Sequence, residues 1–261
     1  MKDRAGSAGV RIGTSGWVYR AWKGPFYPAE LPQGRWLAFY GGVFATAEIN
    51  ATFYRLPTQA AVAGWREAAP SGFIFAWKAS RFLTHMKRLR DAEASLERIV
   101  SPMRALGPKL GPALFQLPPS LKVDVPRLSD FLAVLPDDLQ CVVEFRDPGW
   151  YVDSVYAALA AHGVALCISD HHHAPAPWIA TSQTIYVRGH GPKGAYAGAY
   201  AQSTLIAWAE KLAAWRGEGR AIYAYFDNDI GCAAPADALR LQRLLLEAEP
   251  VTGGALDNPT H

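Results

Sequence analysis

Eight short apolar runs recur along the chain, and stretches with helical periodicity separate most of them. The runs end around Gly13, Asn50, Lys78, Gln116, Arg146, Asp170, Arg188 and Asp227. Strand–helix alternation repeated eight times is typical of a (β/α)8 barrel. We therefore expect an α/β fold with a single TIM-type barrel over residues 10–248. The stretch 170–183 holds three His and two Pro without helical periodicity, which predicts a degenerate sixth helix.

Composition agrees with one soluble barrel domain. The chain has 261 residues, of which 50% are hydrophobic and 19% charged, and a barrel of this kind fills that length. We expect residues 1–9 to form a disordered N-terminus and residues 249–261 a tail. The start lacks the apolar core of a signal peptide, and no stretch is as long as a membrane span. The expected location is the cytoplasm, where Cys141, Cys167 and Cys232 would be reduced thiols.

Side-chain alternation along each strand predicts which residues face the barrel interior. The second strand is expected over residues 43–54, which would place Glu48, Asn50 and Thr52 on one face. Because the outer face of a barrel strand packs against helices, the polar face should turn inward. The residues expected there are Glu48, Asn50, Thr52, Lys78, Gln116, Glu144, Arg146, Tyr186, Arg188, His190, Tyr223, Tyr225 and Asp227.

Such a polar layer has two interpretations. Glu144 with Arg146, and Glu48 with Lys78, can be ion pairs that serve stability alone. Buried ion pairs are poor stabilisers, however, because desolvation offsets their attraction. Several charged residues at the carboxyl ends of barrel strands, where the catalytic sites of such barrels lie, favour a functional site.

Anion binding is the first candidate chemistry. Arg146 and Arg188, supported by Lys78, can bind a phosphate or carboxylate, because the planar guanidinium makes bidentate bonds to such groups. The Gly-rich loop 190–194 follows the seventh strand, where barrels often bind phosphate, although an ordinary flexible loop has the same pattern. The residues expected to orient the substrate are Asn50, Tyr54, Gln116, Tyr225 and Asn228.

Acid–base chemistry is the second candidate. Glu48 and Glu144 are the glutamates at predicted strand ends, and His190 is an alternative proton carrier. A glycosidase-like carboxylate pair is disfavoured, because common glycosidase barrels carry their pair on other strands than the second and fifth.

No cofactor is predicted, and a divalent metal is an alternative that is not favoured. Asp170, His190, Glu144 and Asp227 have suitable ligand atoms, but no spaced ligand motif is present. The run 171–173 consists of three consecutive His, which is more typical of a solvated loop than of a metal site.

The leading hypothesis is an enzyme with hydrolase-like acid/base chemistry acting on a small phosphate- or carboxylate-bearing substrate. The alternative is a nucleic-acid-binding protein, connected with repair, because loop aromatics can stack on bases. Those aromatics are Trp17, Tyr19, Trp22, Phe26, Tyr27, Trp150 and Tyr151, and they can equally pack as lids over the barrel end. The net charge of only +3 and the absence of a recognised nucleic-acid motif argue against this alternative. Protein partners are not indicated, and no membrane association is expected.

Several long motifs resemble the YecE-like family, a mostly bacterial set of proteins grouped as domain of unknown function 72. The motifs are Ile12–Trp17, Glu48–Pro57, Leu114–Pro119, Glu144–Arg146, Tyr186–Gly191 and Tyr223–Asp229. The resemblance covers about residues 10–245 and implies a TIM-type barrel without a settled reaction. The chain departs from the family pattern with Asp227-Asn228-Asp229 where a doubled asparagine is expected, and with Ala51 in place of a serine.

Overall fold

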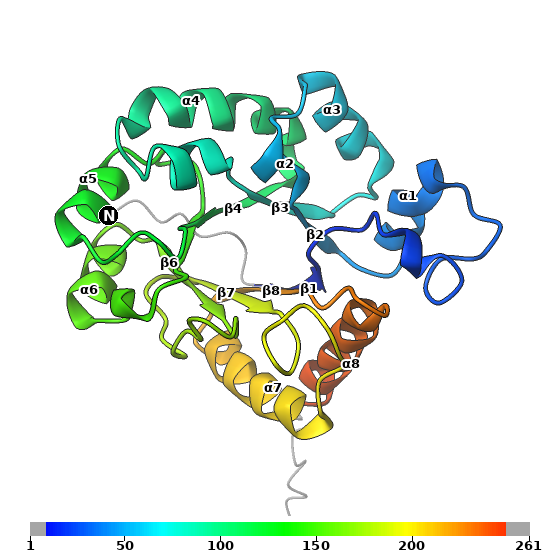
Figure 1. The fold of residues 1–261 in the computed structure, drawn as a ribbon. Helices are drawn as coiled ribbons and strands as arrows, with labels where there is room; N and C mark the ends of the chain where they lie inside the picture. The colour runs from blue at the N-terminus through cyan, green and yellow to red at the C-terminus, as the bar shows by residue number, and fades with distance from the viewer. Residues whose placement is uncertain (1–8, 249–261) are drawn as a thin grey trace, which may run out of the picture.

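The protein, seen in a computed structural model that describes residues 9–248, is an eight-stranded parallel barrel surrounded by helices (Figure 1). The strands are β1 (Val10–Thr14), β2 (Thr46–Ile49), β3 (Ile74–Lys78), β4 (Leu110–Gln116), β5 (Cys141–Glu144), β6 (Ala165–Ser169), β7 (Thr184–Gly189) and β8 (Ala221–Phe226). Their order is β1-β8-β7-β6-β5-β4-β3-β2. The predicted barrel is confirmed. Residues 1–8 and 249–261, expected to be disordered start and tail, lie outside the described residues.

The helices alternate with the strands along the chain. They are α1 (Trp36–Gly41), α2 (Ala51–Tyr54), α3 (Gln59–Ala68), α4 (Ala92–Met103), α5 (Val125–Ala133), α6 (Asp153–Ala161), α7 (Gln202–Gly217) and α8 (Ala233–Glu247). No helix lies between β6 and β7, so the expected loss of the sixth crossover helix is confirmed. None of the helices within residues 9–248 is long and apolar enough to cross a membrane.

Alternating side chains divide the core into two parts. On β4, Phe115 packs outward among the helices, while Leu114 belongs to a separate cluster inside the barrel. The other buried members of the inner cluster are Ala76, Val142, Ala165, Cys167, Tyr186, Ala221, Tyr223 and Tyr225. Each large apolar side chain removed from water contributes about 1.5–3 kcal/mol. This apolar interior closes the barrel below the polar strand ends.

The Tyr40 side chain connects β1 and β2, the two strands at which the barrel closes, because few backbone hydrogen bonds join them directly. The Thr14 amide donates to the Tyr40 hydroxyl at 2.9 Å, and that hydroxyl donates to the Thr46 carbonyl at 3.1 Å. One direct backbone bond, from Gly16 to Glu48 at 2.8 Å, lies further along. The strands approach so closely here that a Cβ at Gly13 would lie 2.2 Å from the Thr46 oxygen.

The expected second strand over residues 43–54 is wrong at its carboxyl end. β2 stops at Ile49, and residues 51–54 form the single-turn helix α2. The Thr52 hydroxyl contacts the Ile49 carbonyl at 3.1 Å and donates to the Lys78 carbonyl at 2.6 Å. Such side-chain-to-backbone bonds compete with the sheet ladder and turn the chain. Asn50 and Thr52 therefore do not continue the strand face of Glu48.

Candidate functional site

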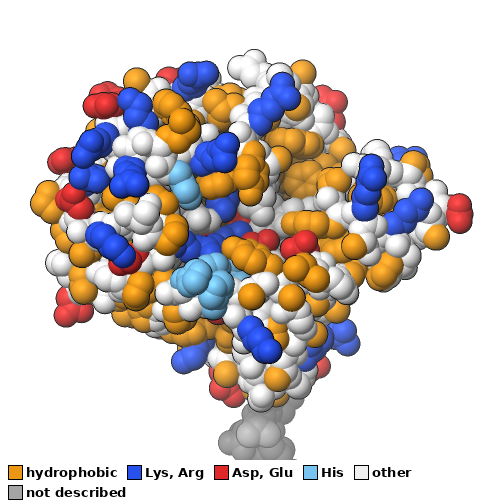
Figure 2. All heavy atoms as spheres, viewed as in Figure 1, with side chains coloured by type: hydrophobic (Ala, Val, Ile, Leu, Met, Phe, Trp, Pro, Cys, Tyr) orange, Lys and Arg blue, Asp and Glu red, His pale blue; other side chains and the backbone are white. Residues whose placement is uncertain are grey.

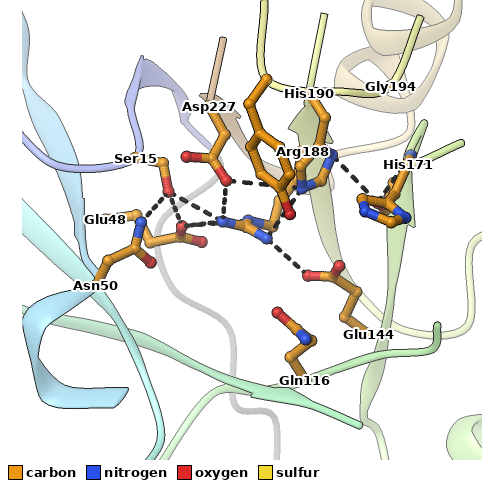
Figure 3. Close-up of polar contacts among 12 residues, drawn as sticks. Ser15, Glu48, Asn50, Gln116, Glu144, His171, Arg188, His190, Gly194 and Asp227 are labelled. Carbon is orange, nitrogen blue, oxygen red and sulfur yellow. Dashed lines mark hydrogen bonds and ion pairs between the residues drawn. The ribbon is translucent and has the colours of Figure 1, made fainter. Parts of the chain in front are cut away.

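Arg188, near the carboxyl end of β7, lies at the centre of a buried polar cluster (Figure 3). Its Nη2 donates to Asp227 at 2.8 Å and to Ser15 Oγ at 3.0 Å, while Nη1 donates to Glu144 at 2.9 Å. Nε and Nη2 both donate to Glu48 Oε1, at 3.1 and 2.9 Å. Arg188 is only 1% exposed. Its guanidinium is committed to protein acceptors, which leaves it no free edge for a substrate anion.

The two strand-end glutamates are fully buried partners of arginines. Glu48 also accepts hydrogen bonds from the Ser15 hydroxyl and, at 2.6 Å, from the Tyr186 hydroxyl. Glu144 forms a second ion pair, with Arg146 Nε. Burial raises the pKa of Glu144, but the charges of Arg146 and Arg188 outweigh it and hold that pKa well below its usual range. Glu144 is therefore ionised at neutral pH and has no proton to donate.

Asp227 differs from the two glutamates. It follows β8 and is 8% exposed, and its Oδ2 accepts from Arg188. Burial raises the pKa of Asp227 above its ordinary value, against the opposing charge of Arg188. Burial thus makes Asp227 easier to protonate than an ordinary aspartate.

His190 is held in one orientation. It is fully buried, its backbone amide donates to Asp170 Oδ1 at 2.7 Å, and its Nδ1 lies 3.3 Å from the same oxygen. Its Nε2 lies 3.1 Å from Arg146 Nη2 and 3.2 Å from Arg188 Nη1. Guanidinium nitrogens only donate, so the hydrogen-bond network assigns the ring proton to Nδ1 and makes Nε2 an acceptor. This arrangement positions the arginines, and Nε2 also lies 3.6 Å from Asp227 Oδ2.

Two cations remain incompletely paired at the opening. Arg146, 5% exposed, makes only long hydrogen bonds with its Nη1 and Nη2 to Tyr196 Oη (3.3 Å) and Gln116 Oε1 (3.5 Å), besides its contact with His190. Lys78 Nζ lies 4.2 Å from the centre of the Phe53 ring. Among residues 9–248, Lys78 Nζ has neither a hydrogen-bond acceptor nor an ion-pair partner. Burial, reinforced by the charge of Arg188, lowers the pKa of Lys78 to about 8.

Two histidines at this opening have lowered pKa values, chiefly because they are buried. Burial, then the charges of Lys78, Arg81 and Arg146, lower the pKa of His85 to about 4. Burial, then Arg146 and His190, lower the pKa of His171 to about 3. Figure 2 shows Lys, Arg and His side chains around the central hollow of this face, with Asp and Glu side chains among them. The cations that add to the shifts of both histidines also attract an anion.

The remaining predicted substrate-orienting residues are divided. Asn50 donates to Ser15 Oγ at 2.6 Å, and its buried Oδ1 has no hydrogen-bond partner among the described residues. Tyr54 is 70% exposed at the rim. Tyr225 lies inside the barrel with its hydroxyl 2.7 Å from Thr46 Oγ1. Asn228 turns toward α8, where its amide donates to Asp237 at 2.8 Å and to a loop carbonyl at 2.7 Å.

The metal alternative gains no support from the described residues, which contain no group of three or more His, Cys, Asp or Glu arranged to hold an ion. In the run 171–173, His172 and His173 are exposed, as expected of a solvated loop. His171 is buried instead and packs edge-on against His190 with ring centroids 5.4 Å apart.

The loop aromatics serve as packing groups. Trp22, Tyr27 and Trp150 are fully buried, and Trp17 is 7% exposed. These four side chains belong to the core between the strands and the helices, so they do not offer exposed faces on which bases could stack.

Ser15 and Tyr196 also contact the site residues, although the sequence pattern did not predict them there. Ser15 follows β1 and touches Glu48, Asn50 and Arg188. Its position at a strand end was the available signal. Tyr196 lies in the Gly-rich segment after β7, and nothing in the sequence indicated its contact with Arg146.

The eight-stranded barrel and its buried strand-end cluster define a TIM-type barrel protein with a polar site at the carboxyl end of the sheet. The chain belongs to the family described as "Protein of unknown function DUF72", which matches residues 11–259. This confirms the resemblance drawn from the motifs.

Individual relatives agree with this membership. The chain is 31% identical over 113 residues to the UPF0759 protein YecE of Escherichia coli K12, a match spanning 43% of this chain and 42% of that protein. A DUF72 family crystal structure from Thermotoga maritima has a TM-score of 0.81 at 26% identity, covering 91% of this chain and 99% of that one. One from Enterococcus faecalis has a TM-score of 0.75 at 19% identity, covering 91% and 95%; at that identity the likeness concerns the fold alone.

Proposed function

We propose that this protein is an enzyme that binds a small phosphate- or carboxylate-bearing substrate at the carboxyl end of the barrel and transforms it by acid–base chemistry. The observation that carries the proposal is the pair of cations at the opening. Lys78 has no acidic partner among the described residues, and the outer edge of Arg146 has only long hydrogen bonds. An anion bound between Lys78 and Arg146 would accept hydrogen bonds from both cations.

The roles of the acidic groups follow from their partners. Glu48 and Glu144 hold Arg188, and Arg188 with His190 fixes Arg146, so these four residues position the site. Asp227, whose pKa is raised by burial, is the group best suited to give and take a proton. Hydrolysis is the reaction class we favour, because a protonated carboxyl beside an anion site can protonate a leaving oxygen.

Thermal unfolding with inorganic phosphate, sugar phosphates and small carboxylates tests this function. A ligand that binds only the folded state raises the melting temperature by mass action. A charged hydrogen bond is worth about 1.5–3 kcal/mol, so Arg146→Ala should weaken a binding anion about tenfold or more. Arg127→Ala is the matched control, because Arg127 lies on α5 and pairs with Asp124. An anion effect equal in both variants, or none in the unmodified protein, contradicts the proposal.

Nucleic-acid binding remains the rival function, and it now rests on fewer observations. The argument from base stacking on loop aromatics is weaker, because Trp22, Tyr27 and Trp150 are buried. Oligonucleotides in the same thermal panel decide between the two. A protein that contacts about six or more phosphates loses roughly a thousandfold in affinity between 50 and 200 mM salt. A stabilisation seen only with oligonucleotides and lost in this way would replace the small-anion function.

A further inference from the structure

Lys78 is rooted on a rigid part of the barrel. It is the last residue of β3, and its carbonyl accepts the Thr52 hydroxyl at 2.6 Å. The next amide, of Ala79, donates to Leu114 on β4 at 2.8 Å. Groups on strands are held more accurately than groups on loops. The amine therefore projects from a fixed point at the edge of the opening.

The amine of Lys78 is excluded from the ion-pair network around it. Arg188 contacts Glu48, Glu144 and Asp227, and Arg146 takes the remaining oxygen of Glu144. Lys78 Nζ is left over the face of Phe53, itself 8% exposed. A lysine that served only to neutralise the carboxylates would contact one of them.

This environment makes the amine reactive. Burial and then Arg188 lower the pKa of Lys78 to about 8, while Glu144, Glu48 and Asp227 oppose that shift. The His85 pKa of about 4 leaves that residue neutral at pH 7, so it adds no further positive charge beside the amine. A pKa of about 8 leaves about one amine in ten neutral at pH 7, against about one in three thousand for an ordinary lysine. The neutral amine is the nucleophilic form.

We propose that Lys78 is a nucleophile that forms a Schiff base with the aldehyde or ketone carbonyl of a small anionic substrate. This deepens the proposed function and rests on it for the anion, which Arg146 would hold. The nitrogen lone pair attacks the carbonyl carbon, and one N–H proton passes to the oxygen to give a carbinolamine. The hydroxyl then takes up a second proton, the C–O bond breaks and water leaves, while the nitrogen releases its other N–H proton and the C=N bond forms. Amine and carbonyl thus give imine and water without an oxidant or reductant.

The test is reductive trapping of the full-length protein with glyoxylate, an aldehyde that carries a carboxylate, and cyanoborohydride. Peptide mass mapping then compares Lys78 with Lys122, whose side chain is 75% exposed and pairs with Asp147. At pH 7 we expect Lys78 to be modified about tenfold faster or more, because a larger fraction of its amine is neutral. Glycolaldehyde, a neutral aldehyde of similar size, should show a smaller preference for Lys78. Modification of Lys78 no faster than that of Lys122 overturns the proposal.

Two variants separate this inference from the proposed function. Lys78→Arg keeps the positive charge but cannot form an imine, so anion-induced thermal stabilisation should persist. Arg146→Gln should reduce glyoxylate trapping at Lys78 to the level seen with glycolaldehyde. Arg146-dependent stabilisation without trapping refutes the Schiff base alone. Absence of that stabilisation refutes the anion site, whatever is trapped at Lys78.

Discussion

Glu48, Glu144 and Asp227 are carboxylates withdrawn from water at the end of the barrel, and all three contact the guanidinium of Arg188. An unpaired ionised carboxylate in a protein interior costs several kcal/mol, so the burial of all three depends on their partners. Arg188 is the partner that all three share, and Glu144 has Arg146 as a second one. The same commitment explains why Arg146, and not Arg188, faces the opening.

Replacing Arg188 by Met should destabilise the protein by about 3–5 kcal/mol at pH 7, because it leaves buried charges without a partner. Without the guanidinium, burial would raise the pKa of Asp227 further above its unfolded value, because the opposing charge of Arg188 is gone. The folded state then binds more protons, so stability rises as pH falls through the raised pKa. Urea unfolding at pH 7 and pH 5 measures both effects.

Arg127→Met controls for the loss of a paired arginine on a helix surface, with an expected change of about 1 kcal/mol or less. A loss for Arg188→Met that is as small as this, or that is equal at both pH values, would contradict the role given to Arg188. If the variant does not fold at pH 7, recovery of the fold at pH 5 gives the same answer.

At the scale of elements, hydrophobic periodicity predicted the barrel because each strand is a short apolar run buried on both faces. The loss of the helix after β6 followed from the His- and Pro-rich run 170–183. The turn at Asn50 did not follow, because Ala51–Tyr54 contains a β-branched residue and two aromatics, which favour a strand. The hydrogen bond from Thr52 to the β3 carbonyl decides the helix, and that contact is distant in sequence.

Partner choice within the site was also beyond the sequence. Strand alternation placed Glu144 beside Arg146, and that ion pair is present. The suggested pair of Glu48 with Lys78 is wrong, because Glu48 pairs with Arg188 from across the barrel. Alternation gives the face of a side chain but not its height or reach. The height and reach of a side chain depend on the stagger between strands, and this stagger cannot be predicted from a single sequence.

The contact between β1 and β2 gives a test at this scale. Tyr40→Phe removes the hydroxyl that joins the Thr14 amide to the Thr46 carbonyl. Both groups would be buried without that partner, at a cost of about 1–3 kcal/mol. Chemical denaturation measures the loss, and Tyr156→Phe on α6 is the control, since Tyr156 is only partly buried. Equal stability of the two variants would mean that the backbone alone closes the barrel.

At the scale of the whole molecule, the polar carboxyl end of the barrel and its apolar interior contribute differently to the protein. The inner cluster of Leu114, Val142, Tyr186 and their neighbours fills the barrel, so the charged layer need not stabilise it. The Thermotoga maritima barrel retains the fold at 26% identity with a TM-score of 0.81. A fold specified by a pattern rather than by particular residues can carry a charge-rich end at modest cost.

That charge-rich end should make the whole fold sensitive to acid. His85 and His171 have folded pKa values of about 4 and about 3, below the ordinary 6.5. The unfolded chain therefore binds more protons below pH 6.5, and stability falls as pH drops toward the folded values. Glu144, with its lowered pKa, adds a loss below about pH 4.5, whereas the raised pKa of Asp227 acts in the opposite direction.

We expect stability to decrease by roughly 1 kcal/mol per pH unit for each of the two histidines between about pH 6 and 4.5, allowing for partial solvent screening. His85→Asn and His171→Asn should each flatten this part of a urea-unfolding profile, and the double variant should flatten it further. His162→Asn, at an exposed position after α6, is the matched control for removing an imidazole. A profile that stays steep in the double variant would place the acid sensitivity in other groups than these two histidines.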